Sequence, residues 1–168
     1  IVTPPDTFKS PATEVTPVKK GDEFTVGDNT VTITDPYGIR TFKGREGKHS
    51  TGVDYKTSSG NVVALTDGVI KEVKLQGDGS VMTPSQGSAA GYYIVEQSDG
   101  TMAQYMHLDP MTPEEMKSLV GKSISKGEEV WGYSTGSGSM TGPHVKYRQY
   151  EKGKRAKTNH IDPSSLFN

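Results

Sequence analysis

The sequence predicts a mainly β domain, an antiparallel β-sheet or β-sandwich with one short helix and long loops. Three observations favour this class. Apolar and polar residues alternate in short runs, as in "TVTIT" at 30–34. Two β-rich stretches are each interrupted by an Asp-Gly dipeptide, which is a signal for a hairpin turn. The 168 residues include 20 glycines and 10 prolines, so turns must be frequent.

The expected elements follow a proline-rich beginning. Residues 1–23 hold four prolines and few large apolar side chains, so we expect an extended arm or linker there and the domain proper at 24–168. Strands are expected at 30–34, at 61–75 around Asp67-Gly68, at 91–108 around Asp99-Gly100, at 128–134 and at 144–150. The segments richest in Gly and Ser, 76–91 and 134–142, are expected to form long loops.

The stretch "TPEEMKSLVG" at 112–121 predicts the helix. Thr112 is a suitable N-cap, Pro113 fits the first helical position, and Glu115 completes a capping box. Gly121 can end the helix, because glycine accepts the left-handed conformation of a C-terminal cap.

Composition excludes several classes of function. The net charge of −1 gives no general attraction to nucleic acid or to an anionic membrane. No apolar run reaches the ~18–20 residues of a membrane span. The absence of cysteine excludes disulfides and thiolate metal sites. The chain starts with Ile1 and no signal-like segment follows, so we expect a mature or excised piece of a longer protein.

Three of the four histidines stand in motifs that mean more together than apart. The motifs are "KHSTGVDYKTSSGNVVALTDGVI", "DGTMAQYMHLDP" and "TGPHVKYRQY". In this order the chain resembles the lysostaphin-type (LytM-like) zinc metallopeptidases, which cut peptide bridges in bacterial peptidoglycan. The resemblance covers about residues 31–166 and includes "ITDPYGIR" and "HIDPSSLF". It implies the antiparallel fold of these peptidases, with a groove formed and roofed by long loops, of which 134–142 would be a wall.

The resemblance also implies site residues. Asp54 matches the ligand aspartate of the family's H-x-G-x-D motif. His107 in "YMHL" and His144 in "GPHVK" match the two catalytic histidines.

The two other ligand positions depart from the family pattern. The ligand histidine should stand at 50, where this chain has Ser50, and His49 lies one residue early. Neighbouring side chains of a regular strand face opposite sides, so His49 would point away from the metal. A one-residue β-bulge would turn the His49 side chain toward the metal. An insertion of one serine into the family motif explains the same sequence equally well. The third ligand position is occupied by Lys146.

Lys146 changes the chemistry expected at this site. Zinc takes thiolate, imidazole or carboxylate ligands, whereas a protonated ammonium has no lone pair to offer. We therefore hypothesise that an ion pair between Lys146 and Asp54 substitutes for the zinc, because buried charges need partners. The alternative is that Lys146 simply reaches solvent from an edge strand.

Other residues receive simpler interpretations. His160 is expected to be structural or exposed, and the basic run 151–157 to be a solvated hairpin tip, with contact to anionic wall polymer as the alternative. Tyr105 and Tyr133 are expected to line the groove. Most aromatic residues of the strands should be half-buried or in the core, and a few near the groove could stack on sugar or peptide; the set is Tyr37, Tyr92, Tyr93, Tyr105, Tyr133, Tyr147 and Trp131.

Three classes of function remain open. The favoured one is a peptidoglycan-associated, peptidase-like domain without metal that binds wall peptide or a protein partner, such as a cell-wall hydrolase or a virion protein. The second is an active zinc endopeptidase using His49, Asp54 and an unusual third ligand. The third is a structural tail or envelope module with a vestigial groove. No cofactor is expected in the first and third classes, and zinc in the second. An extracytoplasmic or virion location is expected for all three.

Overall fold

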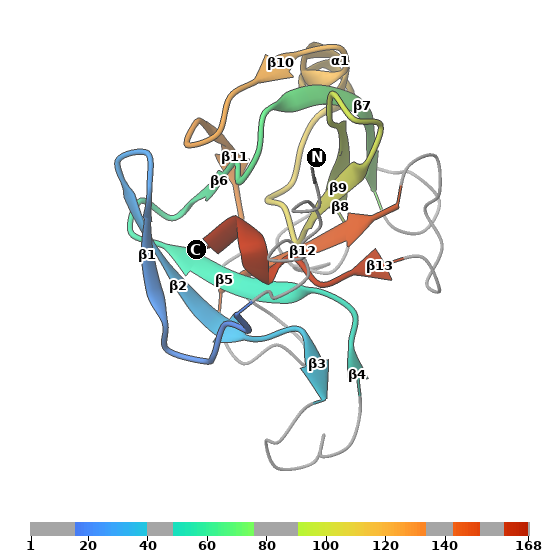
Figure 1. The fold of residues 1–168 in the computed structure, drawn as a ribbon. Helices are drawn as coiled ribbons and strands as arrows, with labels where there is room; N and C mark the ends of the chain where they lie inside the picture. Colours follow the sequence, from blue (N-terminus) through green and yellow to red (C-terminus); the bar gives the residue numbers. More distant parts are fainter. Residues whose placement is uncertain (1–15, 40–48, 76–90, 134–142, 152–159, 168) are drawn as a thin grey trace, which may run out of the picture.

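The computed structural model describes residues 16–39, 49–75, 91–133, 143–151 and 160–167 (Figure 1). For Ile39, His49 and Leu75 only the backbone is described. Most of the expected arm, the two Gly- and Ser-rich loops and nearly all of the basic run therefore lie outside the described residues. In the described end of the arm, Val18 is 5% exposed and packs into the core.

Within the described residues, nine strands form one antiparallel sheet, so the predicted fold class is confirmed. Its order along the sheet is β1 (Glu23–Val26), β2 (Asn29–Asp35), β5 (Val53–Thr57), β12 (Val145–Tyr150), β9 (Met102–Met106), β8 (Gly91–Glu96), β7 (Gly68–Leu75) and β10 (Ser123–Ile124), with β13 (His160–Ile161) also paired to β12. Two small sheets pair β6 (Asn61–Val63) with β11 (Glu129–Gly132) and β3 (Gly38–Ile39) with β4 (His49–Ser50). The helix α1 (Pro113–Leu119) lies beside β7 and β10, and a 3-10 turn at Ser164–Phe167 ends the described chain (Figure 1).

The core contains several buried tyrosines. Tyr55, Tyr93, Tyr105 and Tyr147 are each 0% exposed. The ring centroids of Tyr93 and Tyr105 are 5.1 Å apart, and those of Tyr105 and Tyr147 are 5.0 Å apart. Each hydroxyl has a partner: Tyr55 donates to the Val63 carbonyl, Tyr93 to the Val130 carbonyl and Tyr147 to the Gln149 side chain, while Tyr105 accepts from the Leu65 N–H. These bonds offset the cost of burying four polar groups in a small core.

Alkaline pH is expected to destabilise the fold through these tyrosines. Burial raises the pKa of Tyr105 to about 12, and it also raises the pKa values of Tyr55, Tyr93 and Tyr147. An unfolded tyrosine loses its proton near pH 10, while the folded one keeps it, so the unfolded chain binds fewer protons above that pH. We expect the free energy of unfolding to fall by at least about 1.4 kcal/mol per pH unit between pH 10 and pH 12.

Denaturant unfolding followed by circular dichroism at increasing pH measures this loss. Tyrosinate absorbance recorded on the folded protein is the control. Full ionisation of all tyrosines near pH 10 without loss of stability would contradict the expectation.

Two sequence predictions of local structure are confirmed. Strands β8 and β9 form the hairpin expected at Asp99-Gly100, with Gly100 at φ 87° and the Asp99 carboxylate accepting from the Thr101 N–H at 2.9 Å. The capping box of α1 is present, because the Thr112 hydroxyl accepts from the Glu115 N–H and the Glu115 carboxylate accepts from the Thr112 N–H.

The hairpin predicted at Asp67-Gly68 is wrong. Strand β6 pairs with β11 and strand β7 pairs with β8, so the two runs belong to different sheets. The Asp67 carboxylate instead accepts from the Lys126 N–H at 2.7 Å. Gly68 is needed for a close approach, since a Cβ there would overlap the Val95 side chain. The dipeptide therefore serves packing rather than a two-residue turn.

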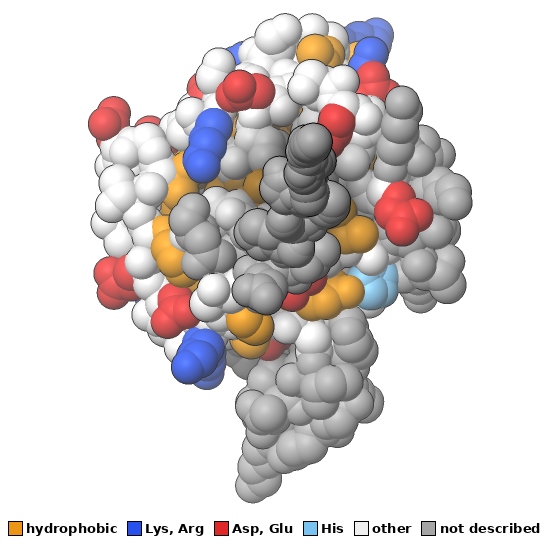
Figure 2. Space-filling model, in the orientation of Figure 1, with side chains coloured by type: hydrophobic (Ala, Val, Ile, Leu, Met, Phe, Trp, Pro, Cys, Tyr) orange, Lys and Arg blue, Asp and Glu red, His pale blue; other side chains and the backbone are white. Residues whose placement is uncertain are grey.

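The charges on the described surface agree with the net charge of −1. In Figure 2, acidic and basic side chains on the visible face are dispersed and of both signs. Among the described residues, no helix combines the length and the apolar character that crossing a bilayer requires.

Candidate functional site

Strands β5 and β12 bring the candidate site residues together at the centre of the sheet. Lys146 stands directly opposite Asp54 in the β12–β5 register and opposite Met106 in the β12–β9 register. Val145 and Tyr147 on β12 are fully buried in the core, and side chains of a strand alternate between its faces. Lys146 therefore lies on the face of the sheet that points away from this core.

An ion pair joins the two strands at this point, as the sequence predicts. The Lys146 Nζ is 3.7 Å from Oδ1 of Asp54, and the His144 Nε2 is 3.5 Å from Oδ2 of the same carboxylate. The side chains of Lys146, His144 and Asp54 are only 12%, 12% and 11% exposed. Oδ1 of Asp54 has no hydrogen bond to the described residues, so the neighbouring ammonium is what compensates its charge.

His107 completes the cluster from the end of β9. Its ring centroid is 5.0 Å from that of His144, with the rings nearly perpendicular at 79°. The His107 backbone has φ 72°, a left-handed conformation that is uncommon for a residue with a side chain. The N–H groups of His107 and Leu108 both donate to the Gly91 carbonyl, at 3.0 and 3.2 Å, and this holds the turn. Such local strain is typical of functional sites.

The ligand positions implied by the resemblance do not fit a zinc ion. Ser50 is 1% exposed and its hydroxyl donates to the Gly52 carbonyl at 2.9 Å, while Lys146 offers an ammonium. Of the three ligand positions 50, 54 and 146, only Asp54 carries a usual zinc ligand. Within the described ranges, no three His, Asp or Glu side chains are grouped closely enough to hold a metal. His49 pairs through its backbone with Ile39, and its side chain is not among the described parts of the chain.

The glycine of the first motif has a packing role. A Cβ on Gly52 would overlap the carbonyl oxygen of Tyr147 and would come within 2.9 Å of Cγ of Arg148. Gly52 thus allows the chain entering β5 to lie against β12, which sets Asp54 opposite Lys146.

Two residues expected in the groove belong to the core. Tyr105 is 0% exposed and lies between Tyr93 and Tyr147, and Tyr133 is 7% exposed. The Tyr133 hydroxyl accepts from the Thr57 N–H at 3.1 Å and donates to the Thr57 carbonyl at 3.4 Å. Because both hydroxyls form hydrogen bonds with backbone groups inside the fold, these two tyrosines are core residues and do not line a groove.

His160 is partly buried and plays a structural part, in agreement with its predicted role. Its Nδ1 lies 2.9 Å from the Tyr37 hydroxyl, and the two ring centroids are 5.5 Å apart. Burial, together with the nearby Asp162 carboxylate, raises the pKa of Tyr37. This contact ties the strand β13 to the segment between β2 and β3.

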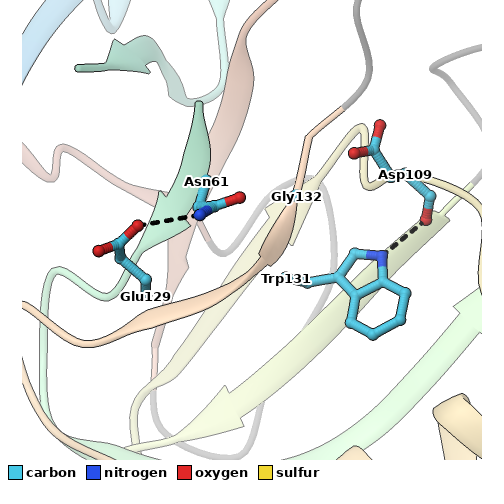
Figure 3. A pocket seen from close by; sticks show the side chains of 5 residues that line it. All are labelled: Asn61, Asp109, Glu129, Trp131 and Gly132. Atoms are coloured by element: carbon cyan, nitrogen blue, oxygen red, sulfur yellow. Dashed lines mark hydrogen bonds between the residues drawn. The ribbon is translucent and has the colours of Figure 1, made fainter. Parts of the chain in front are cut away.

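A second feature was only partly visible in the sequence. A depression of about 410 Å³ is lined by residues from β6, β11 and the segment after His107 (Figure 3): Asn61, Asp109, Glu129, Trp131 and Gly132. The sequence singles out Trp131 as an aromatic residue among strands, but no pattern links it to Asp109, because the pairing of β6 with β11 brings the set together.

Comparison with known proteins identifies a protein family and a curated relative. Residues 48–163 match the family described as Peptidase family M23. The chain is 26% identical over 121 residues to the peptidoglycan DD-endopeptidase ShyA of Vibrio cholerae, covering 71% of this chain and 24% of ShyA. The chain thus spans about a quarter of the length of this curated relative.

Solved structures show the same fold. The catalytic domain of the antimicrobial peptidase lysostaphin from Staphylococcus simulans superposes with a TM-score of 0.54 at 21% identity, covering 86% of this chain and 92% of that one. A variant of the catalytic domain of the prophage-encoded M23 protein EnpA from Enterococcus faecalis gives a TM-score of 0.51 at 25% identity, covering 79% and 88%. The resemblance read from the three motifs is confirmed, and the chain belongs to peptidase family M23.

Proposed function

We propose that this M23 domain is a metal-free, peptidase-like module that binds peptidoglycan peptide or a protein partner and does not cut it. The observation that carries the proposal is the ammonium of Lys146, 3.7 Å from the Asp54 carboxylate at a position where the family places a zinc ligand. A lysine there supplies positive charge to the carboxylate that would otherwise face the metal.

The chemistry of Lys146 opposes a metal at this place. To ligate zinc, the lysine would have to lose a proton that an unperturbed side chain holds up to a pKa of about 10.4. Its neighbour Asp54 is already compensated, and Ser50 already donates to a backbone carbonyl. A zinc ion would therefore have to displace an ion pair and would gain only one carboxylate from the family's three ligand positions.

Without a metal, the two histidines can still form hydrogen bonds with a bound peptide. His107 and His144 lie edge to face, His144 lies beside Asp54, and an imidazole can donate and accept hydrogen bonds. In a groove they would contact the N–H and carbonyl groups of an extended peptide. No described residue of the site offers an activated nucleophile, so binding is the favoured outcome.

The relatives support the polymer and the location that we propose. ShyA is a peptidoglycan DD-endopeptidase and lysostaphin is an antimicrobial peptidase. We place this domain on the same polymer, outside the cytoplasm or on a virion, with wall peptide, a cell-wall hydrolase or a virion protein as partner.

The test is metal analysis of protein purified without chelator, followed by co-sedimentation with purified peptidoglycan. We expect far less than one zinc per chain and retention on peptidoglycan. The variant His107→Ala with His144→Ala should reduce retention severalfold, while Glu114→Ala on the exposed start of α1 should not. Stoichiometric zinc would favour the active endopeptidase that uses His49 and Asp54. Absence of both zinc and retention would favour the structural module.

A further inference from the structure

The depression beside β11 is built around a strained tryptophan. Trp131 has φ 73°, and a left-handed backbone is a genuine outlier for a bulky side chain. Two hydrogen bonds hold this arrangement: the Trp131 indole N–H donates to the Asp109 carbonyl, and the Asp109 N–H donates to the Gly132 carbonyl, both at 3.0 Å. Backbone strain that the surroundings enforce points to a function for the residue.

Gly132 leaves the floor of the depression open. A Cβ there would overlap Oδ2 of Asp109 and would lie 3.7 Å from Oδ1 of Asn61. Figure 3 shows Asp109 and Trp131 on one side of Gly132, and Asn61 and Glu129 on the other. Two acceptor oxygens therefore flank the same bare stretch of strand.

The orientation of the Asn61 amide is fixed by its neighbour. Its Nδ2 donates to the Glu129 carboxylate at 2.9 Å, and a carboxylate can only accept. The amide oxygen of Asn61 must therefore face Gly132. The same bond is the main cause of the lowered pKa of Glu129, so this carboxylate already has a donor.

The Asp109 carboxylate lies in a less polar environment than that of Glu129. Burial raises the pKa of Asp109, and neither Asp109 nor Glu129 forms an ion pair with the described residues. A cation would be drawn to a pair of free carboxylates. Here the acceptors over Gly132 are one carboxylate oxygen and one neutral amide oxygen, beside an indole.

This combination matches a sugar ring. A pyranose presents an apolar C–H face, which packs on an aromatic ring, and a rim of hydroxyl groups, which donate to carboxylate and amide oxygens. The depression has a volume of about 410 Å³, within the ~300–1,000 Å³ range of small-molecule sites. An anionic sugar would be repelled by Asp109 and Glu129.

We propose that the depression lined by Asn61, Asp109, Trp131 and Gly132 is a subsite for a neutral sugar residue. The indole of Trp131 packs against the ring, and the oxygens of Asp109 and Asn61 accept from its hydroxyls. This deepens the proposed function, on which the choice of a wall sugar rests: a module that holds wall peptide at His107 and His144 would also hold the glycan strand at β11.

The experiment uses the intrinsic fluorescence of the whole chain. Trp131 is its single tryptophan, so the emission reports on this depression alone. Titration with triacetylchitotriose, a neutral N-acetylhexosamine trimer, should give a saturable change. Asp109→Ala should weaken binding about tenfold or more, since a hydrogen bond to a charged group is worth about 1.5–3 kcal/mol. Its backbone bonds to Trp131 and Gly132 remain.

Two further variants and a second ligand test the specificity of the subsite. Glu114→Ala removes a carboxylate of α1 and should leave the affinity unchanged. Asn61→Ala removes the second acceptor and should weaken binding severalfold. An unresponsive fluorescence, or an affinity that Asp109→Ala leaves unchanged, would overturn the subsite. A saturable response to trilysine in place of the trimer would overturn it in favour of a cation site.

This inference and the proposed function fail in different experiments. The sugar titration involves neither Asp54 nor Lys146, so stoichiometric zinc with intact sugar binding would remove only the proposed function. Retention on peptidoglycan without a fluorescence response to the trimer would remove only the sugar subsite.

Discussion

Replacing Lys146 with methionine is expected to lower the free energy of unfolding by about 3 kcal/mol. The change shortens the side chain by one atom and removes its charge, which takes the ammonium away from the buried Asp54 carboxylate and leaves His144 beside it. Breaking one partner of a buried pair costs about 3–5 kcal/mol, and the proximity of His144 places the effect at the lower end. Urea unfolding of Lys146→Met measures it.

A double-mutant cycle separates the pair from the packing of the lysine stem. Asp54→Asn combined with Lys146→Met should recover most of the lost stability, because no unpaired charge remains. Lys74→Met is the matched control: its Nζ is 3.2 Å from the Glu72 carboxylate, but the lysine is 60% exposed, so we expect a change within about 0.5 kcal/mol. A similarly small effect of Lys146→Met would mean that this lysine is in effect a solvated surface residue.

Converting Ser50 and Lys146 together to histidine is expected to create a zinc site. The double variant Ser50→His with Lys146→His restores three usual ligands with Asp54. Zinc that binds only the folded state stabilises it by mass action, by about 2.7 kcal/mol at a free concentration one hundred times the dissociation constant. Thermal unfolding with and without zinc, and calorimetric titration, measure the gain. The unmodified chain is the control and should gain little.

The single variant Lys146→His decides the register of the first motif. If Ser50 is the ligand position, Lys146→His alone should bind zinc much more weakly than the double variant. Equal affinity of the two would mean that His49 is aimed at Asp54, as a bulge would permit. No zinc binding by either variant would contradict the assignment of these positions to a metal site.

Local signals predicted the elements whose determinants are close in the sequence. The capping box at Thr112 and Glu115 and the hairpin at Asp99-Gly100 depend on neighbours within a few residues, and both are present. The pairing of Lys146 with Asp54 followed from a motif resemblance that already fixed which strands lie together. The hairpin prediction at Asp67-Gly68 failed because Gly68 is required by its contact with Val95, a residue far along the chain.

Burial and backbone strain could not be predicted from the sequence. Tyr105 and Tyr133 look like groove residues beside their motifs, but their hydroxyls bond to Leu65 and Thr57 inside the fold. Nothing in "YMHL" indicates the left-handed φ of His107, and nothing in "EVWG" indicates that of Trp131. These features arise from tertiary contacts: the carbonyl of Gly91 for the first and the Asp109 backbone for the second.

The alternation along β12 has a consequence for protein engineering. Val145 and Tyr147 anchor the strand in the core, whereas His144 and Lys146 point to the opposite face. Positions 144 and 146 can therefore be varied in a library while the packing layer beneath them stays constant, provided that position 54 is varied with them so that no unpaired carboxylate is left. Selection from such a library would sample metal centres and neutral binding surfaces above one packing layer, which makes β12 a natural starting point for redesign.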